Sequence, residues 1–413
     1  MIFQALKYPN LRLFLFGQLC SLVGTWMQIV AGSWLIYRLT DSPWLLGVFA
    51  FAMNFPTLLF SPLAGVAADR FDRRNLLILV NVLSMIQAFV LWLLVFTGMV
   101  QLWHLMVLSM VLGVLNAYEL PLRQSLISQL VDDHRDLPNA IALNSSVFNG
   151  SRLVGPAVAG AVISFLGEGV CFLVNALSFL PVIATLLAMR LASHHRASAQ
   201  PDSGGIRAGF AYVRASMPIR LLLIMVSVLS MVNGAFYALA PVFARDVFGG
   251  GPQVLGYLLS FSGFGAFLGA AYLAGRRTVI GLGRIVAVAG IAAGAAYMVF
   301  AVYPDIRLAS FAIFLCGFCV IASIGGMNII IQTLVDEHMR GRVMSMYALA
   351  LVGISPFGSL AAGALAMHAG EVTAMFLSGI LAMAAMGYFW FCLPSFRAKV
   401  RPIYARKGII PEV

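Results

Sequence analysis

Three charged residues, Glu119, Arg123 and Arg152, lie within long apolar stretches of the chain. A charge near the centre of a bilayer costs at least about 2.5–3.5 kcal/mol on insertion scales, so it usually has a function. Glu119 and Arg123 are one helical turn apart, which allows a local ion pair, and we expect Arg152 to approach Glu119 from another helix. A carboxylate there could take up a proton, and the arginine that it releases could bind an anionic group. A purely structural ion pair is the alternative.

The composition indicates that the stretches containing these residues lie in a membrane. Apolar residues make up 61% of the 413 residues and charged residues only 10%, which indicates a membrane protein. Runs of about 20 apolar residues, each able to cross a hydrocarbon core of ~30 Å as a helix, recur along the chain. We predict an all-α membrane protein with twelve transmembrane helices, at residues 11–37, 44–67, 75–98, 102–128, 139–165, 170–190, 220–245, 252–274, 284–303, 308–334, 343–367 and 373–393.

The formal net charge of +11 is distributed unevenly between the loops. If the N-terminus is cytoplasmic, the outer loops contain only Arg38, Arg245 and Arg307 among the lysines and arginines. Apart from Arg123 and Arg152 inside the apolar stretches, all the others lie at the other loops and the two ends. This asymmetry follows the positive-inside rule and predicts that both termini are cytoplasmic. The charge therefore indicates membrane topology, and we expect no nucleic-acid partner.

A polar segment divides the chain into two halves. Residues 191–219 are rich in Ser, Gly and Arg and are predicted to form a cytoplasmic linker. This gives an N-terminal six-helix half at 1–190, a C-terminal six-helix half at 220–393 and a cytoplasmic tail at 394–413.

The two halves carry matching sequence. LVDDH, from Leu130, recurs as LVDEH from Leu334, and both follow the fourth span of a half. Two glycines of the fifth helix are also matched, at an offset of 203: Gly155 and Gly160 by Gly358 and Gly363. Parallel repeats of this size are typical of secondary transporters with a substrate site between the repeats.

Polar residues follow one face of several predicted helices and are candidates for lining a substrate cavity. On the first helix they are spaced i, i+3, i+7 and i+10. Interhelical hydrogen bonding is the alternative interpretation. The candidates are Gln18, Ser21, Thr25, Gln28, Asn116, Ser230, Asn233, Tyr237, Asn328 and Gln332.

The turn between the second and third helices has an unusual charge density. It carries Gly65, Asp69, Arg70, Arg73 and Arg74, in the pattern G-x-x-x-D-R-x-x-R-R. This pattern resembles the loop signature of the major facilitator superfamily. The resemblance implies that the loop latches the cytoplasmic side by docking on a helix of the other half when the protein opens outward. A hairpin held by positive-inside arginines is the alternative.

The fifth predicted helix supports a narrower resemblance. Gly155, Pro156 and Gly160 resemble the signature G-x-x-x-G-P-x-x-G-G of drug antiporters, although Ser151 and Ala159 replace two of its glycines. With the preceding segment, this helix is similar to the bacterial exporter branch that includes enterobactin and macrolide efflux proteins. A proline-kinked packing helix is the alternative.

The resemblance implies a secondary transporter of the bacterial inner membrane. We expect a monomer in the lipid bilayer that exports an amphipathic small molecule, such as a drug or a siderophore, by proton antiport and alternating access. No cofactor or metal is expected, and the proton gradient would supply the energy. The sequence has no nucleophile with a base, no metal-ligand set and no G-x-x-x-x-G-K-[ST] motif, so an enzyme is not expected. An importer or facilitator of the same fold and a lysolipid transporter or flippase are the alternatives.

Overall fold

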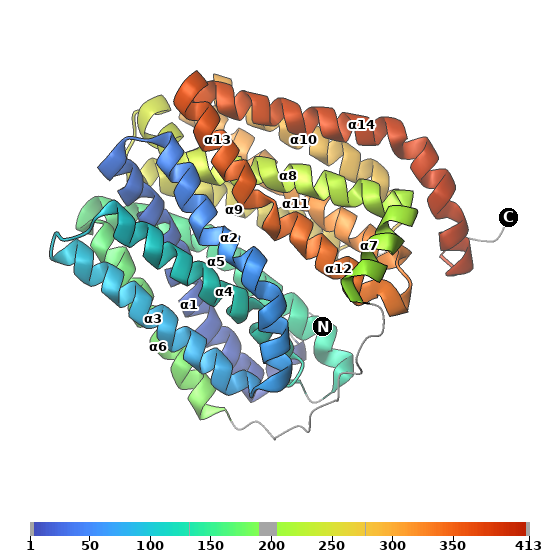
Figure 1. Cartoon of the computed structure of the whole chain (residues 1–413), viewed down its shortest axis with the longest axis horizontal. Coiled ribbons are helices and arrows are strands. Elements are labelled where there is room, and N and C mark those ends of the chain that lie inside the picture. Colours follow the sequence, from blue (N-terminus) through green and yellow to red (C-terminus); the bar gives the residue numbers. More distant parts are fainter. Residues whose placement is uncertain (1–3, 132, 190–204, 277, 410–413) are drawn as a thin grey trace. The chain divides into compact units, whose positions relative to one another are not determined.

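The computed structural model describes residues 4–131, 133–189, 205–276 and 278–409, and these are almost entirely helical (Figure 1). The chain forms two compact units. The first unit consists of Met1–Ala199 and Ala240–Gly263, and the second of Gln200–Leu239 and Phe264–Val413.

The first unit contains the six long helices of the N-terminal half. Within it α1 lies against α5 and α6, α2 lies against α4, and α3 lies against α4 and α6 (Figure 1). Two short 3-10 helices, η1 (Gln4–Lys7) and η2 (His134–Asp136), flank the long ones. The long helices are α1 (Pro9–Thr40), α2 (Pro43–Arg70), α3 (Arg73–Phe96), α4 (Leu102–Ile127), α5 (Leu137–Leu166) and α6 (Glu168–Ala188).

The C-terminal part of the chain repeats this pattern of packing. In the second unit α10 lies against α11 and α14, just as α3 lies against α4 and α6 in the first. Two helices, α8 and α9, contribute residues to both units. The elements are α7 (Gly205–Ala215), α8 (Met217–Val242), η3 (Phe243–Val247), α9 (Pro252–Ala274), α10 (Leu282–Val302), α11 (Ile306–Leu334), η4 (Glu337–Met339), α12 (Arg340–Ala348), η5 (Leu349–Gly353), α13 (Ser355–Ala369) and α14 (Glu371–Arg406).

The predicted all-α membrane fold is confirmed. Within the described residues, eleven helical stretches are long and apolar enough to cross a membrane. The remaining predicted span, 139–165, coincides with α5, which is helical throughout and carries Arg152. Each of the twelve predicted spans therefore corresponds to helical structure.

Local sequence explains where several helices begin. Asp72 and Asp305 are N-caps, and the Asp305 carboxylate accepts hydrogen bonds from the backbone N–H groups of Arg307 (2.8 Å) and Leu308 (3.0 Å). Gly167 and Gly370 adopt positive φ angles of 83° and 84° in the turns before α6 and α14. These glycines are 203 residues apart, so the repeat extends to the turn geometry.

The span predicted at 343–367 lies within one helical stretch, Glu337–Ala369, which is not a uniform α-helix. The helix is interrupted by the π-helical turn η5 between α12 and α13. Pro356 lies in the first turn of α13 and has no N–H to continue the ladder of hydrogen bonds, and the Ser230 hydroxyl donates to the carbonyl of Leu351. The prediction for 394–413 also omitted a helical part, since α14 continues to Arg406.

The matched glycines have matched packing roles. A side chain at Gly155 would meet Val23 and Trp26 on α1, and one at Gly358 would meet Met231 on α8. In both halves the fifth span thus approaches the first span closely at the glycine identified from the sequence offset.

Candidate functional site

The charged residues of α4 form a buried pair in the first unit. The Arg123 Nη1 atom lies 3.1 Å from Glu119 Oε1, across one helical turn. The Arg123 side chain is 4% exposed, whereas the Glu119 side chain is 22% exposed. The same Nη1 atom donates to Gln18 Oε1 of α1 at 3.4 Å. The structure thus brings together two charged residues of α4 and the first polar residue of the stripe on α1.

This cluster leaves two hydrogen-bond donors unused. Among the described side chains, Arg123 Nε and Gln18 Nε2 are buried atoms without a hydrogen-bond partner. A buried donor without a partner costs about 1–3 kcal/mol, and more when the group is charged. Both donors could bind an oxyanion such as a carboxylate, for which a guanidinium is well suited.

An aromatic ring lies near each of the two arginines, Arg123 of α4 and Arg152 of α5. The Arg123 guanidinium lies 5.7 Å from the centre of the Phe148 ring, and that of Arg152 lies 5.8 Å from the Trp26 ring. Arg152 is half-buried and one helical turn from Phe148. The expected approach of Arg152 to Glu119 stays a prediction, since the interaction described for Glu119 is with Arg123.

Gln28, at the other end of the polar stripe on α1, belongs to a network of hydrogen-bonded side-chain amides. The amide of Gln28 donates to Gln87 Oε1 on α3 (3.0 Å) and accepts from Asn175 Nδ2 on α6 (2.7 Å). Gln87 in turn donates to the carbonyl of Leu108 at 3.2 Å. Gln28 therefore has partners on two neighbouring helices, as in the alternative of interhelical hydrogen bonding.

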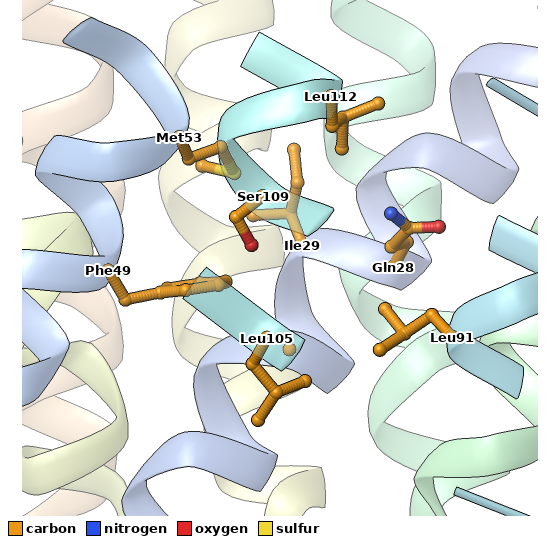
Figure 2. Close-up of a pocket in the computed structure, with 9 residues that line it drawn as sticks. Gln28, Ile29, Phe49, Met53, Leu91, Leu105, Ser109 and Leu112 are labelled. Atoms are coloured by element: carbon orange, nitrogen blue, oxygen red, sulfur yellow. The ribbon is translucent and has the colours of Figure 1, made fainter. Parts of the chain in front are cut away.

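Figure 2 shows a small cavity beside this network, with Phe49, Ile29, Ser109 and Leu105 around it. Its volume is about 10 Å³. A single water molecule needs roughly 10–15 Å³ on this measure, so the cavity holds one water at most and is not a substrate site.

The remaining polar candidates of the first unit have fewer described hydrogen bonds. Ser21 is buried, and its carbonyl accepts from the Thr25 hydroxyl at 2.9 Å. Asn116 is half-buried on α4.

In the second unit, polar candidates on α8 and α11 have hydrogen-bond partners. Gln332 donates to Asn328 at 2.7 Å and accepts from Arg340 at 3.0 Å. Tyr297 donates to Asn233 at 3.5 Å, and Tyr237 is half-buried on the same helix, α8.

The charged loop is partly described. Gly65, Asp69 and Arg70 belong to the last turns of α2, and their side chains lie outside the described part of the structure. Arg73 is half-buried in the first turn of α3. Arg74 donates to the carbonyls of Leu186 (2.6 Å) and Leu187 (2.8 Å) at the end of α6. Arg74 therefore caps a helix of its own half, and a latch through Asp69 stays a prediction.

The residues of the fifth-helix signature are packed closely. Pro156 is buried, and a side chain at Gly160 would meet the backbone of Pro252 and Gly256 on α9. Ser151 and Ala159 are fully buried, so small residues serve where the signature has glycine. This packing is compatible with both interpretations of the signature.

Sequence reasoning missed an ionic cluster at the end of α1. Arg245 of η3 pairs with Asp41 (2.5 Å) and with Asp246 (2.9 Å), and its guanidinium lies 4.3 Å from the centre of the Tyr37 ring. The Tyr37 hydroxyl donates to Asp246. Nearby in sequence, Arg38 pairs with Glu168 at 2.8 Å. The outer arginines were the available signal, because Asp41 and Asp246 lie close to Arg38 and Arg245 in the sequence.

Comparisons with known proteins agree with the arrangement of helices. The family model for the transmembrane secretion effectors of the major facilitator superfamily matches residues 3–405. The chain is 25% identical over 375 residues to the staphyloferrin A transporter of Staphylococcus aureus, covering 89% of this chain and 92% of that one. It is 27% identical over 405 residues to the multidrug efflux pump Tap of Mycolicibacterium fortuitum, covering 95% and 97%.

A solved structure has the same fold. The bacterial homologue of the human lysosomal transporter Spinster matches with a TM-score of 0.74, over 94% of this chain and 97% of that one, at 16% identity. Among the described residues, no group of three or more His, Cys, Asp or Glu could hold a metal ion.

Proposed function

The chain belongs to the transmembrane secretion effector family of the major facilitator superfamily, and we propose that it exports an amphipathic small molecule with an anionic group by a mechanism coupled to protons. The export acts across the bacterial inner membrane, with both termini in the cytoplasm and the halves divided by the segment 191–219. Two relatives support the choice of substrate class by their names, one as a siderophore transporter and one as a multidrug efflux pump.

The observation that carries the proposal is the cluster of Gln18, Glu119 and Arg123. It holds one acidic group, one guanidinium and two buried donors without partners. The cluster lies within apolar helices, where charged groups cost free energy, and this favours a function for the pair.

The Glu119 carboxylate and the anionic group of a substrate compete for Arg123 at this cluster, so anion binding is linked to proton uptake by Glu119. When Glu119 is ionised, its carboxylate neutralises Arg123 across 3.1 Å. A proton on Glu119 cancels the negative charge and leaves the guanidinium to bind the anionic group of a substrate, with Gln18 as a second donor. Loss of the proton restores the pair and weakens substrate binding. Glu119 is the more exposed partner, so the proton can reach it without displacing Arg123.

The experiment uses Glu119→Gln, which keeps the shape of the side chain but cannot ionise. A thermal-shift screen of the purified protein against siderophores, macrolides, lysolipids and dyes first identifies a ligand. Its uptake into inside-out vesicles is then measured at imposed pH gradients. We expect Glu119→Gln to bind the ligand but to lose the pH dependence of transport.

Glu168→Gln is the matched control, because it removes the other described Glu–Arg pair of the first unit, with Arg38. It should keep the pH dependence. If Glu119→Gln still concentrates the ligand when only a pH gradient is supplied, proton coupling through Glu119 is wrong. If the wild type only equilibrates the ligand, the facilitator alternative replaces proton-coupled export.

A further inference from the structure

The end of α14 forms one wall of a cavity whose lining contains none of the candidate substrate or proton-coupling residues. The cavity has a volume of about 510 Å³, within the range of roughly 300–1,000 Å³ typical of small-ligand sites. It lies in the second unit, between the segment 279–283, Ile330 of α11 and the last turns of α14.

The length of α14 places this wall at the membrane surface. Its 36 residues make a helix of about 54 Å, whereas the hydrocarbon core is about 30 Å thick. The predicted span ends at residue 393, and the helix continues to Arg406. Lys407, directly after the helix, donates to the carbonyls of Thr333 (2.8 Å) and Val335 (2.9 Å) and so fixes this end against α11.

The extension of α14 has two adjacent faces with different chemistry. Leu393, Phe396 and Val400, spaced i, i+3 and i+7, are buried at 3–4% exposure and supply an apolar wall. Arg397 and Arg401 are exposed, are one turn apart and also line the cavity. The cavity is therefore apolar inside and cationic along one edge.

The opposite rim is a folded turn. Arg276 donates to the carbonyl of Ile280 at 3.0 Å, and Ile280 N–H donates to the Thr278 hydroxyl at 3.1 Å. Gly281 completes the turn with a φ of 78°. The Ile280 side chain is 52% exposed and lines the cavity at its edge.

Among the described residues, no carboxylate lines the cavity beside the two arginines. Its described lining contains Arg397 and Arg401 but no Asp or Glu. Like charges one turn apart on a helix repel each other, and an anion bound between them removes the repulsion.

We propose that this cavity binds an anionic phospholipid of the cytoplasmic leaflet. An acyl chain lies on the apolar wall, and the phosphate binds Arg397 and Arg401. Basic pockets between transmembrane helices at the cytoplasmic surface are suited to anionic head groups, and the apolar wall distinguishes such a lipid from a free anion. This site belongs to the second unit and shares no residue with the Glu119 cluster of the first, so it does not depend on the proposed transport mechanism.

The experiment measures lipid binding to the purified full chain in neutral detergent by native mass spectrometry. The probes are phosphatidylglycerol and phosphatidylcholine with the same acyl chains. We expect preferential binding of phosphatidylglycerol, and a loss of about tenfold or more of that preference in the double variant Arg397→Gln/Arg401→Gln. Lys399→Gln is the matched control, since Lys399 is exposed on the opposite side of the helix and does not line the cavity.

Ile280→Trp is a second variant that fills the cavity from its exposed rim. It should weaken phosphatidylglycerol binding with both arginines present, and it decides the question if the double variant does not fold. Equal binding of the two lipids, or equal loss in Lys399→Gln and the double variant, would overturn the proposal. Inorganic phosphate that displaces phosphatidylglycerol at equal concentration would also overturn it, because the site would then be a simple anion site.

Discussion

Two glutamines on α1 illustrate how a buried amide can serve packing or binding. The Gln28 amide has partners on α3 and α6, which come from positions 59 and 147 residues away in the chain. The Nε2 atom of Gln18 is buried without a partner. A satisfied amide stabilises the helix bundle, whereas an unsatisfied donor beside a guanidinium gains a hydrogen bond when a ligand arrives.

This contrast gives a paired prediction. Gln28→Leu should destabilise the protein by about 1–3 kcal/mol, because it leaves the amides of Gln87 and Asn175 without their partner. Gln18→Leu removes only one long hydrogen bond, the 3.4 Å contact from Arg123, so it should destabilise the protein less than Gln28→Leu but weaken ligand binding. Thermal unfolding of the purified variants, with and without ligand, measures both effects. Equal destabilisation by the two substitutions would contradict the assignment of Gln18 to binding.

Arg152 permits a second prediction at the same scale. Arg152→Ala should abolish or severely weaken transport, and Arg152→Lys should keep part of it, because a point charge replaces a planar guanidinium imperfectly. The aromatic ring of Trp26, 5.8 Å from the guanidinium, also favours arginine over lysine. Vesicle uptake measures transport, and thermal unfolding tests for folding. Wild-type transport by the alanine variant would show that Arg152 is merely tolerated.

The internal repeat is also visible in the hydrogen bonds between helices and loops. The Tyr8 hydroxyl donates to Asp136 at 2.9 Å and accepts from the backbone N–H of Asp133. Tyr212, 204 residues later, donates to Asp336 at 3.0 Å and accepts from its backbone N–H. In both halves a tyrosine before the first long helix therefore holds the loop after the fourth.

The loop of the first half should respond to acid. Asp136 Oδ2 lies 2.6 Å from Lys7 Nζ, and hydrogen bonds from Lys7 and then Tyr8 lower the Asp136 pKa from its ordinary value of 3.8. Because the folded pKa is the lower one, ionised Asp136 contributes stability above pH 3.8 that is lost as the pH falls through the folded pKa. Lys7 has a raised pKa, so its contribution is lost only at alkaline pH, above 10.5.

Asp136→Asn should therefore lower the unfolding temperature at pH 7, and its difference from the wild type should shrink as the pH falls below 3.8. The measurement is thermal unfolding in detergent from pH 7 down to the acid limit of the detergent. Tyr8→Phe is the control, because it removes the hydroxyl but keeps the pair of Lys7 and Asp136. A difference between Asp136→Asn and the wild type that does not change with pH would contradict the ionic role.

At the scale of elements, apolar length was enough to predict the helices, because a helix must satisfy its backbone within the bilayer. The π-helical turn η5 before Pro356 was not predicted. A proline in the sequence does not by itself indicate such a turn, because Pro156 lies inside α5, which is continuous. Which amides meet depends on the neighbouring helix, and the spacing within one helix does not contain that information. The pair of Glu119 and Arg123 was predictable because both residues are on one helix.

At the scale of the whole molecule, membership in the major facilitator superfamily confirms a multi-pass membrane transporter rather than an enzyme. The family implies a small-molecule substrate, and it leaves the direction and the coupling of transport to experiment. The loop between α2 and α3 bears on this question, because its predicted contact would form in one conformation and break in another.

Asp69→Asn tests that contact. If the Asp69 carboxylate binds the other half in one state only, its loss removes a charge-assisted contact from that state and leaves folding and insertion intact. A contact of about 1 kcal/mol would change the ratio of states about fivefold, and transport should slow. The accessibility of single introduced cysteines from the two sides of the membrane measures this ratio. Asp72→Asn is the matched control, because it removes a charge three residues away while asparagine keeps the N-cap of α3. An unchanged ratio together with wild-type transport in Asp69→Asn would rule out the latch. The loop would then be a hairpin held by its arginines, one of which, Arg74, donates hydrogen bonds to carbonyls at the end of α6.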